Sequence, residues 1–176
     1  AAMFAYIAGA TFVLQRIYLM SPQGFSYAFG INALGIMAMA QVGARLARTW
    51  PTVRVLGFGL GLNLLGAVGV LVSVLFGAGL VPLLIALWVM VSSVGLVFPT
   101  ATTIALADYP HQAGRASSLL GLGQYIGGAL VAPLVGLAGE HTAVPMGVVV
   151  GGGSVAAGLG FWFLVGRTLR SRGEIV

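Results

Sequence analysis

The residues of this chain that could do covalent or metal chemistry are few and far apart. Asp108, His111 and Ser117 have the residue types of a nucleophilic triad, but they lie in or beside one short loop with nothing to orient them. His111 and His141 fall in different loops, at least ~30 Å apart if the apolar run between them crosses a membrane, so they cannot share a metal ion. The chain has no cysteine, which excludes disulfides and thiolate metal sites. We therefore expect neither an enzyme nor a metal or cofactor site.

Uncharged polar residues instead recur at helical spacing inside long apolar runs. Buried amides are costly in hydrocarbon unless they are paired, so those of Gln15, Asn32, Asn63 and Gln124 should face other helices or a wet cavity. Gln15, Asn32 and Gln124, together with Trp88 and Tyr125, are our candidates for lining a substrate cavity, although interhelical hydrogen bonding explains the same placement. The stripes with spacings of three and four are Phe4, Ala8, Thr11 and Gln15; Phe25, Phe29, Asn32, Ile36 and Met39; Trp88, Ser92, Gly95, Pro99 and Thr103; and Ser117, Gly121, Gln124, Gly128 and Val131.

The elements that would position these side chains are membrane-spanning helices. Hydrophobic residues make up 59% of the chain, its mean hydropathy is +1.06, and charge is absent from 17–44, 55–107, 116–139 and 142–166, each long enough for the ~20 residues that cross a bilayer. The runs are apolar at both odd and even positions, which argues against barrel strands. The longest run, 55 to 107, is divided by "GAGLVP" at residues 77 to 82, where Gly and Pro indicate a turn. We therefore predict an all-α, polytopic domain over 1–166, with six spans near 2–18, 25–46, 55–77, 82–106, 116–138 and 144–166, followed by a basic tail, 167–176.

The arginines predict how this domain is oriented. Six spans place both ends of the chain and the loops after the second and fourth spans on one side, and that side carries seven of the eight arginines. Basic residues accumulate on the cytoplasmic side, so we expect both ends in the cytoplasm. The basic pI near 10.5 does not indicate nucleic acid, because the arginines are scattered over short loops and a tail. The seven are Arg45, Arg48, Arg54, Arg115, Arg167, Arg170 and Arg172, and the exception is Arg16.

Glycine spacing predicts where helices approach closely. Glycines four residues apart allow two helix backbones to come together in a membrane. The chain has three such pairs, Gly57 with Gly61, Gly123 with Gly127, and Gly147 with Gly151.

Several stretches resemble the C-terminal six helices of a major facilitator superfamily transporter, and most closely the Bcr/CflA group of bacterial drug exporters. They are "FVLQ" (12–15), "SPQGFSYAFGINALGIM" (21–37), "ARL" (44–46) and "AGRASSLLGLGQYIGGALVAPLVGL" (113–137). The resemblance implies two inverted three-helix repeats, with the first, second, fourth and fifth spans around a central cavity. It also implies proton-coupled export of small apolar molecules by alternating access across the bacterial inner membrane, with an N-terminal six-helix half as partner.

Other functions remain open at this point. A self-contained six-span binding subunit, a homodimeric channel, or an uptake transporter of the same fold has the same pattern. An intramembrane protease of the rhomboid type is disfavoured, because Ser154 in "GGGSVAAG" has no histidine inside any predicted span. The chain begins inside an apolar run, so we expect a piece of a longer protein. No predicted span contains Asp, Glu or His away from its ends, so a residue that couples transport to protons is expected in the missing half.

Overall fold

The computed structural model describes residues 2–107, 110–136 and 144–165. Within these ranges the chain forms helices and turns and no strand, which confirms the all-helical prediction. The predicted tail, residues 167–176, lies outside the described residues. The helices are α1 (Ala2–Phe12, continued by a π-helical turn, Val13–Ile17), α2 (Pro22–Leu46), α3 (Thr52–Leu75), α4 (Leu80–Ala107), a 3₁₀ turn (Pro110–Gln112), α5 (Ala113–Gly136) and α6 (Val144–Gly160, continued by a π-helical turn, Phe161–Val165).

Local sequence signals explain where these helices begin and end. Ser21 caps α2 by accepting a hydrogen bond from the Gly24 N–H at 3.1 Å, and Pro22 occupies the first turn, where its missing N–H does no harm. The uncharged run from 55 to 107 forms two helices, α3 and α4. Between them Gly77 (φ 59°) and Gly79 (φ 93°) adopt the left-handed conformation that glycine tolerates best.

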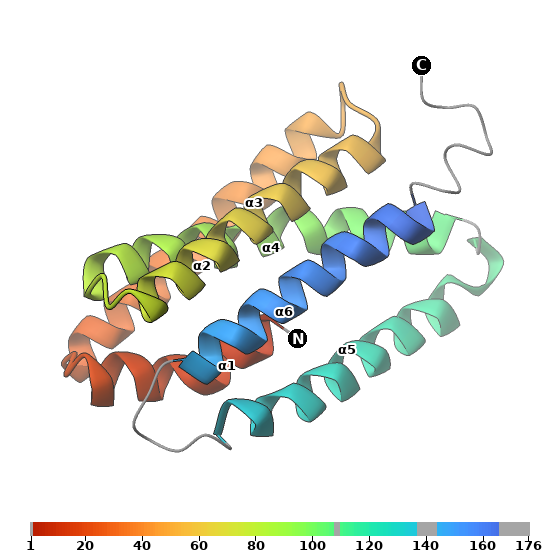
Figure 1. Cartoon of the computed structure of the whole chain (residues 1–176). Helices are drawn as coiled ribbons and strands as arrows, with labels where there is room; N and C mark the ends of the chain where they lie inside the picture. The colour runs from red at the N-terminus through yellow and green to blue at the C-terminus, as the bar shows by residue number, and fades with distance from the viewer. Residues whose placement is uncertain (1, 108–109, 137–143, 166–176) are drawn as a thin grey trace.

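The six helices form a bundle of two groups. α4 packs against α2 and α3, α1 packs against α5 and α6, and α3 contacts α6 between the groups. The buried apolar core draws on α1, α3, α4 and α6, with Leu14, Val70, Leu87 and Met146 among its members. Figure 1 shows α5 along one edge of the bundle, beyond α1 and α6.

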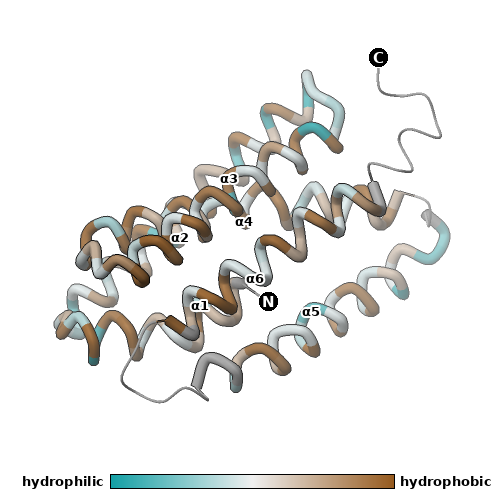
Figure 2. Tube along the Cα trace, in the orientation of Figure 1, coloured by the Kyte–Doolittle hydropathy of each residue, from teal (hydrophilic) through white to brown (hydrophobic). Residues whose placement is uncertain are grey.

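Not every helix has the apolar length of a membrane span. Among the described residues, four segments are long and apolar enough to cross a bilayer: Pro22–Leu46, Thr52–Leu75, Leu80–Ala107 and Met146–Phe163. The Met3–Ile17 segment is apolar but shorter, and α5 is not one of the four. Figure 2 shows hydrophilic residues gathered at helix ends, notably at the α2–α3 and α4–α5 connections. The count of six spans remains a prediction.

Close helix approach occurs at glycines other than the predicted pairs. A Cβ added at Gly66 would lie 2.5 Å from the backbone nitrogen of Met90, so α3 and α4 touch there. At Gly61, Gly123 and Gly127 no described atom lies within 4 Å of such a Cβ, and at Gly57, Gly147 and Gly151 the neighbours are at ordinary contact distance. Of the predicted pairs, Gly147 and Gly151 contact Leu71 of α3 at ordinary distance, and the tightest approach instead occurs at Gly66, where α3 and α4 cross.

Candidate functional site

Asn32 is the most deeply buried of the predicted cavity residues. It lies on α2, is 7% exposed, and donates a hydrogen bond from Nδ2 to the Tyr6 hydroxyl on α1 at 2.7 Å. Tyr6 is buried as well. A buried amide needs such a partner in hydrocarbon, and here the partner is another helix of the same chain. This bond joins α1 to α2.

Aromatic rings surround this hydrogen bond. The rings of Tyr6 and Phe29 stack at 5.3 Å between centroids, and Phe25 lies 4.8 Å from Phe29. Phe25, Phe29 and Asn32 belong to one predicted stripe of α2, and all three are buried or partly buried. That stripe therefore faces α1 within the bundle, and the polar group in its middle is satisfied there.

Trp88 on α4 lies beside the same part of α2. Its indole Nε1 donates to the backbone carbonyl of Ile31 at 3.3 Å, while the ring remains partly exposed. The contact depends on Gly35, because a Cβ there would lie 2.8 Å from Trp88 Nε1 and would overlap the Ser92 hydroxyl. Trp88 is thus held against α2 at Ile31, the residue next to Asn32.

Tyr125 on α5 packs against α1. Its ring meets Phe4 edge to face, with centroids 5.8 Å apart, yet 70% of the residue is exposed. A Cβ at Gly128 would approach the Phe4 ring to 2.5 Å, so α5 comes close to α1 at this glycine. Phe4 and Tyr6 are two residues apart and point to roughly opposite sides of their helix, so α1 separates the Asn32 and Tyr125 environments.

The two predicted glutamines are in more open positions. Gln15 lies in the π-helical turn that ends α1 and is partly buried, whereas Gln124 on α5 is exposed. Neither side chain makes a hydrogen bond to another described residue. Unlike Asn32, both amides are therefore available to a ligand or to a helix outside this chain.

Two pockets lie between described residues, and we compared their linings with the five predicted cavity residues. A pocket of about 230 Å³ between α2 and α4 is lined by small residues such as Gly43 and Gly95, and by Pro99. A second, of about 380 Å³, lies between the end of α4 and the start of α5. Neither includes a predicted cavity residue. Nor do three metal-ligating side chains cluster anywhere in the described ranges.

Two polar residues that matter to this arrangement were not predicted as site residues. Tyr6, the partner of Asn32, could have been predicted from its expected depth in the membrane. Met20 lies in the turn between the first two helices, Tyr6 is fourteen residues before it and Asn32 is twelve residues after it, so both fall at a similar depth. Ser93 hydrogen-bonds the Asn63 amide at 3.0 Å and the Met90 carbonyl at 2.6 Å, joining α3 to α4. The predicted stripe of α4 contains Ser92 and not Ser93, so the spacing pointed to the neighbouring serine.

Two curated relatives match almost the whole chain. One, the uncharacterized MFS-type transporter YdgK of Bacillus subtilis, is 34% identical over 161 residues, 92% of this chain. The chain is homologous to transporters of the major facilitator superfamily. This confirms the family resemblance predicted above. A second relative, a bicyclomycin resistance protein homolog of Haemophilus influenzae, is 27% identical over 97% of the chain.

The chain spans less than half the length of these two relatives. It covers 40% of the first and 43% of the second. No protein-family profile and no solved structure matches it. One relative is named as a transporter and the other as a resistance protein homolog, and neither as an enzyme, which is consistent with the expectation of a non-enzyme. Its apolar helices and these membrane-transporter homologues together support a multi-pass membrane protein.

Proposed function

We propose that this chain is the C-terminal half of a secondary active transporter that exports small, largely apolar molecules in exchange for protons, by alternating access. The observation that carries the proposal is the 34% identity to an MFS-type transporter over 92% of the chain. The direction of transport rests on the second relative, whose name refers to bicyclomycin resistance. Resistance to an antibiotic is commonly achieved by exporting it.

The side chains suit a substrate without a fixed charge. Tyr125, Trp88 and Gln124 are exposed on helices assigned to the cavity wall, and Gln15 is partly so. Aromatic surfaces bind apolar groups by burial, and amides add loose hydrogen-bond selection without demanding charge. These four residues, rather than the satisfied Asn32, are the ones we expect to touch substrate. Asn32 and Tyr6 would hold the wall together behind them.

The helix pairing supports an inverted repeat of two three-helix units. If α1 is exchanged with α4, α2 with α5 and α3 with α6, the α2–α4 contact becomes α5–α1 and the α3–α4 contact becomes α6–α1. The α3–α6 contact maps onto itself. Repeats related in this way are common in secondary transporters, and the substrate site usually lies between them and their counterparts in the other half.

Proton coupling assigns a role to the part of the transporter outside this chain. A coupling residue must change charge inside the membrane, and Asp, Glu and His are the usual choices. The sequence between Ile17 and Ala107 contains none of them, and His111 is exposed in the turn before α5. We therefore assign the coupling acid to the N-terminal half.

The orientation follows from charge. Arg45 lies in the last turn of α2, Arg54 in the first turn of α3 and Arg115 in the first turn of α5, and Figure 1 shows these three turns at the same end of the bundle. Arg16 lies in the π-helical turn that continues α1, at the opposite end of the bundle. We propose that the arginine-rich end faces the cytoplasm in a bacterial inner membrane, because basic residues are retained on that side.

The experiment that tests the function is transport by the whole natural protein in liposomes. An imposed proton gradient should drive uphill movement of an apolar antibiotic, and an uncoupler should abolish it. Movement that ignores the gradient, or movement driven in the direction of uptake, would overturn proton-coupled export while leaving the family assignment intact.

A further inference from the structure

The indole of Trp88 is held against α2 by a contact that depends on a glycine. Its N–H donates to the Ile31 carbonyl at 3.3 Å, and a Cβ at Gly35, one turn further along α2, would lie 2.8 Å from the indole nitrogen. Atoms in van der Waals contact normally keep about 3.5 Å or more between them. A side chain at position 35 would therefore push the indole nitrogen away from its acceptor.

The side chains, and not the helices, would shift to make room. A Cβ at Gly95 would overlap the Ile36 carbonyl, so the backbones of α2 and α4 are in contact close to Gly35. A Cβ at Gly35 would instead meet the ends of two side chains, the Ser92 hydroxyl and the Trp88 indole. Side-chain ends move by rotation, whereas the backbone contact at Gly95 keeps the two helices in place.

The hydrogen bond to Ile31 decides what Trp88 offers to a ligand. The indole has one polar group, a donor N–H, and Ile31 already occupies it. The residue is nonetheless 42% exposed. A ligand therefore meets an aromatic surface without a free donor. Such a surface favours apolar groups, because a hydrogen-bond acceptor pressed against it loses its bond to water and gains none in return.

We propose that Gly35 is a positioning residue for substrate selection. By leaving room for the bond between Trp88 and Ile31, it withholds the indole N–H from the cavity and biases the transporter toward ligands with no acceptor at that point. This rests on the assignment of Trp88 to the cavity wall in the proposed function. Gly35 is buried and acts through Trp88. A methyl group at position 35 turns the indole away from Ile31 and frees its N–H for a ligand carbonyl.

The test compares the binding of two uncharged aromatic dyes to the whole natural transporter in lipid nanodiscs, with empty nanodiscs as the blank. Prodan carries a carbonyl acceptor, which N-phenylnaphthylamine lacks. Gly35→Ala should raise the affinity for prodan relative to N-phenylnaphthylamine about three- to tenfold, the size of one hydrogen bond. With every other tryptophan of the protein replaced by phenylalanine, the same substitution should shift the emission maximum of Trp88, because the indole has moved.

Matched variants separate positioning from general packing. Gly30→Ala makes the same change on the same helix, where no described atom lies within 4 Å of a Cβ, and should alter neither readout. Trp88→Phe keeps a ring but has no N–H, so adding Gly35→Ala to it should leave the dye ratio unchanged. Combining Gly35→Ala with Ser92→Gly removes the overlap with the serine and not the one with the indole. That protein should regain stability and keep the shifted ratio.

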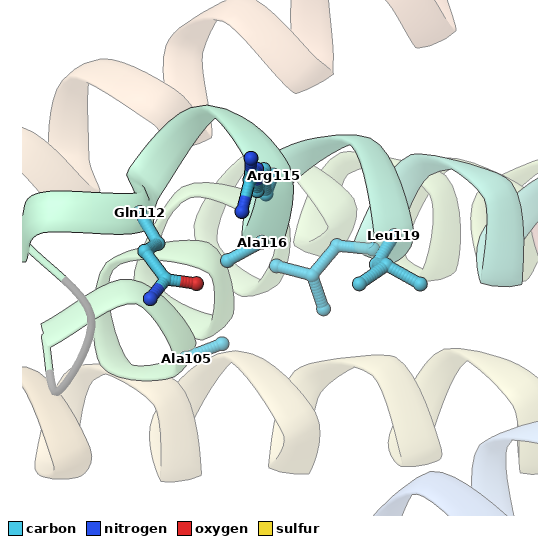
Figure 3. Close-up of a pocket in the computed structure, with 6 residues that line it drawn as sticks. Ala105, Gln112, Arg115, Ala116 and Leu119 are labelled. Atoms are coloured by element: carbon cyan, nitrogen blue, oxygen red, sulfur yellow. The ribbon is translucent and has the colours of Figure 1, made fainter.

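A second place for a dye is the pocket of about 380 Å³ between the end of α4 and the start of α5. Figure 3 shows Gln112 and Leu119 on its α5 side and Ala105 opposite them on α4. Neither Gly35 nor Trp88 lines it. Leu119→Asn should therefore leave the dye ratio unchanged. Loss of both dyes in Leu119→Asn, with no change of ratio in Gly35→Ala, would place the dyes in that pocket and overturn the proposal.

The other outcomes are equally decisive. A shift of ratio that persists in the Trp88→Phe background would show that Gly35 acts through packing and not through the indole. An unchanged or opposite ratio in Gly35→Ala, an unmoved Trp88 emission, or binding of neither dye would also overturn the proposal. Binding is measured without a proton gradient. Loss of proton-coupled export with an intact shift of ratio would therefore overturn the proposed function alone.

Discussion

Asn32, the most buried amide of the chain, either holds α1 and α2 together through its hydrogen bond to Tyr6 or binds substrate in the cavity. If the bond is structural, the two side chains must stabilise the protein as a pair. We therefore predict strong coupling in a double-mutant cycle made of Asn32→Leu, Tyr6→Phe and the double variant.

The size of the effect follows from the geometry. The bond is 2.7 Å long and both residues are buried, so each single variant leaves one polar group without a partner. That costs about 1–2 kcal/mol in the free energy of unfolding. Interhelical hydrogen bonds in membrane proteins average about 0.6 kcal/mol and reach about 1.7, and a short buried bond belongs in the upper part of that range. The double variant should be about as stable as either single one, with a coupling energy of about 1–1.7 kcal/mol.

The assay is reversible unfolding of the whole protein in mixed micelles, with transport per folded molecule measured on the same preparations. Tyr27→Phe is the control, because Tyr27 is exposed on α2 and its hydroxyl should contribute less than about 0.5 kcal/mol. Additive single effects, with transport altered by Asn32→Leu and not by Tyr6→Phe, would refute the structural role and return Asn32 to the substrate cavity.

Three further predictions concern helix contact, the cavity and topology. Gly128→Ala should destabilise the protein by about 1–3 kcal/mol, because its Cβ would meet the Phe4 ring at 2.5 Å. Gly127→Ala is the control and should not destabilise it, because no described atom lies within 4 Å of a Cβ there. Equal thermal stabilities of the two variants would contradict the α1–α5 contact. Gln124→Leu should change substrate profile or transport rate at unchanged protein level, and a collapse of expression with unchanged transport per molecule would show that Gln124 holds helices together. Because the chain has no cysteine, single cysteines at Arg48 and Leu19 can be labelled selectively, and we expect the first to react from the cytoplasm and the second from outside; the reverse result would invert the orientation.

The positions of helices could be predicted from the sequence because hydrocarbon imposes length and apolarity on every span. The turn at Gly77 and Gly79 was visible as punctuation in an uncharged run, and Ser21 and Pro22 form a recognisable start to α2. The contacts between helices were harder to predict from the sequence. Gly66 and Gly128 contact neighbouring helices because of where the helix axes cross, and a one-dimensional spacing such as Gly123 with Gly127 carries no information about crossing points.

The candidate site could be predicted only in part, for a related reason. A polar stripe tells which residues avoid lipid but not whether they meet another helix or a cavity. Asn32 proved to meet Tyr6, while Gln124 on an equally convincing stripe is exposed. The wall that we propose to complete the cavity lies outside this chain, so whether the five predicted residues line one cavity stays a prediction.

The most direct test of the central claim compares this chain by itself with the same chain joined to its N-terminal partner in liposomes, under an imposed proton gradient. We predict gradient-driven flux of an apolar antibiotic only when both halves are present, because the coupling acid and the opposing cavity wall belong to the partner. Coupled flux from the 176 residues alone would contradict the half-transporter account and would favour a self-sufficient membrane protein.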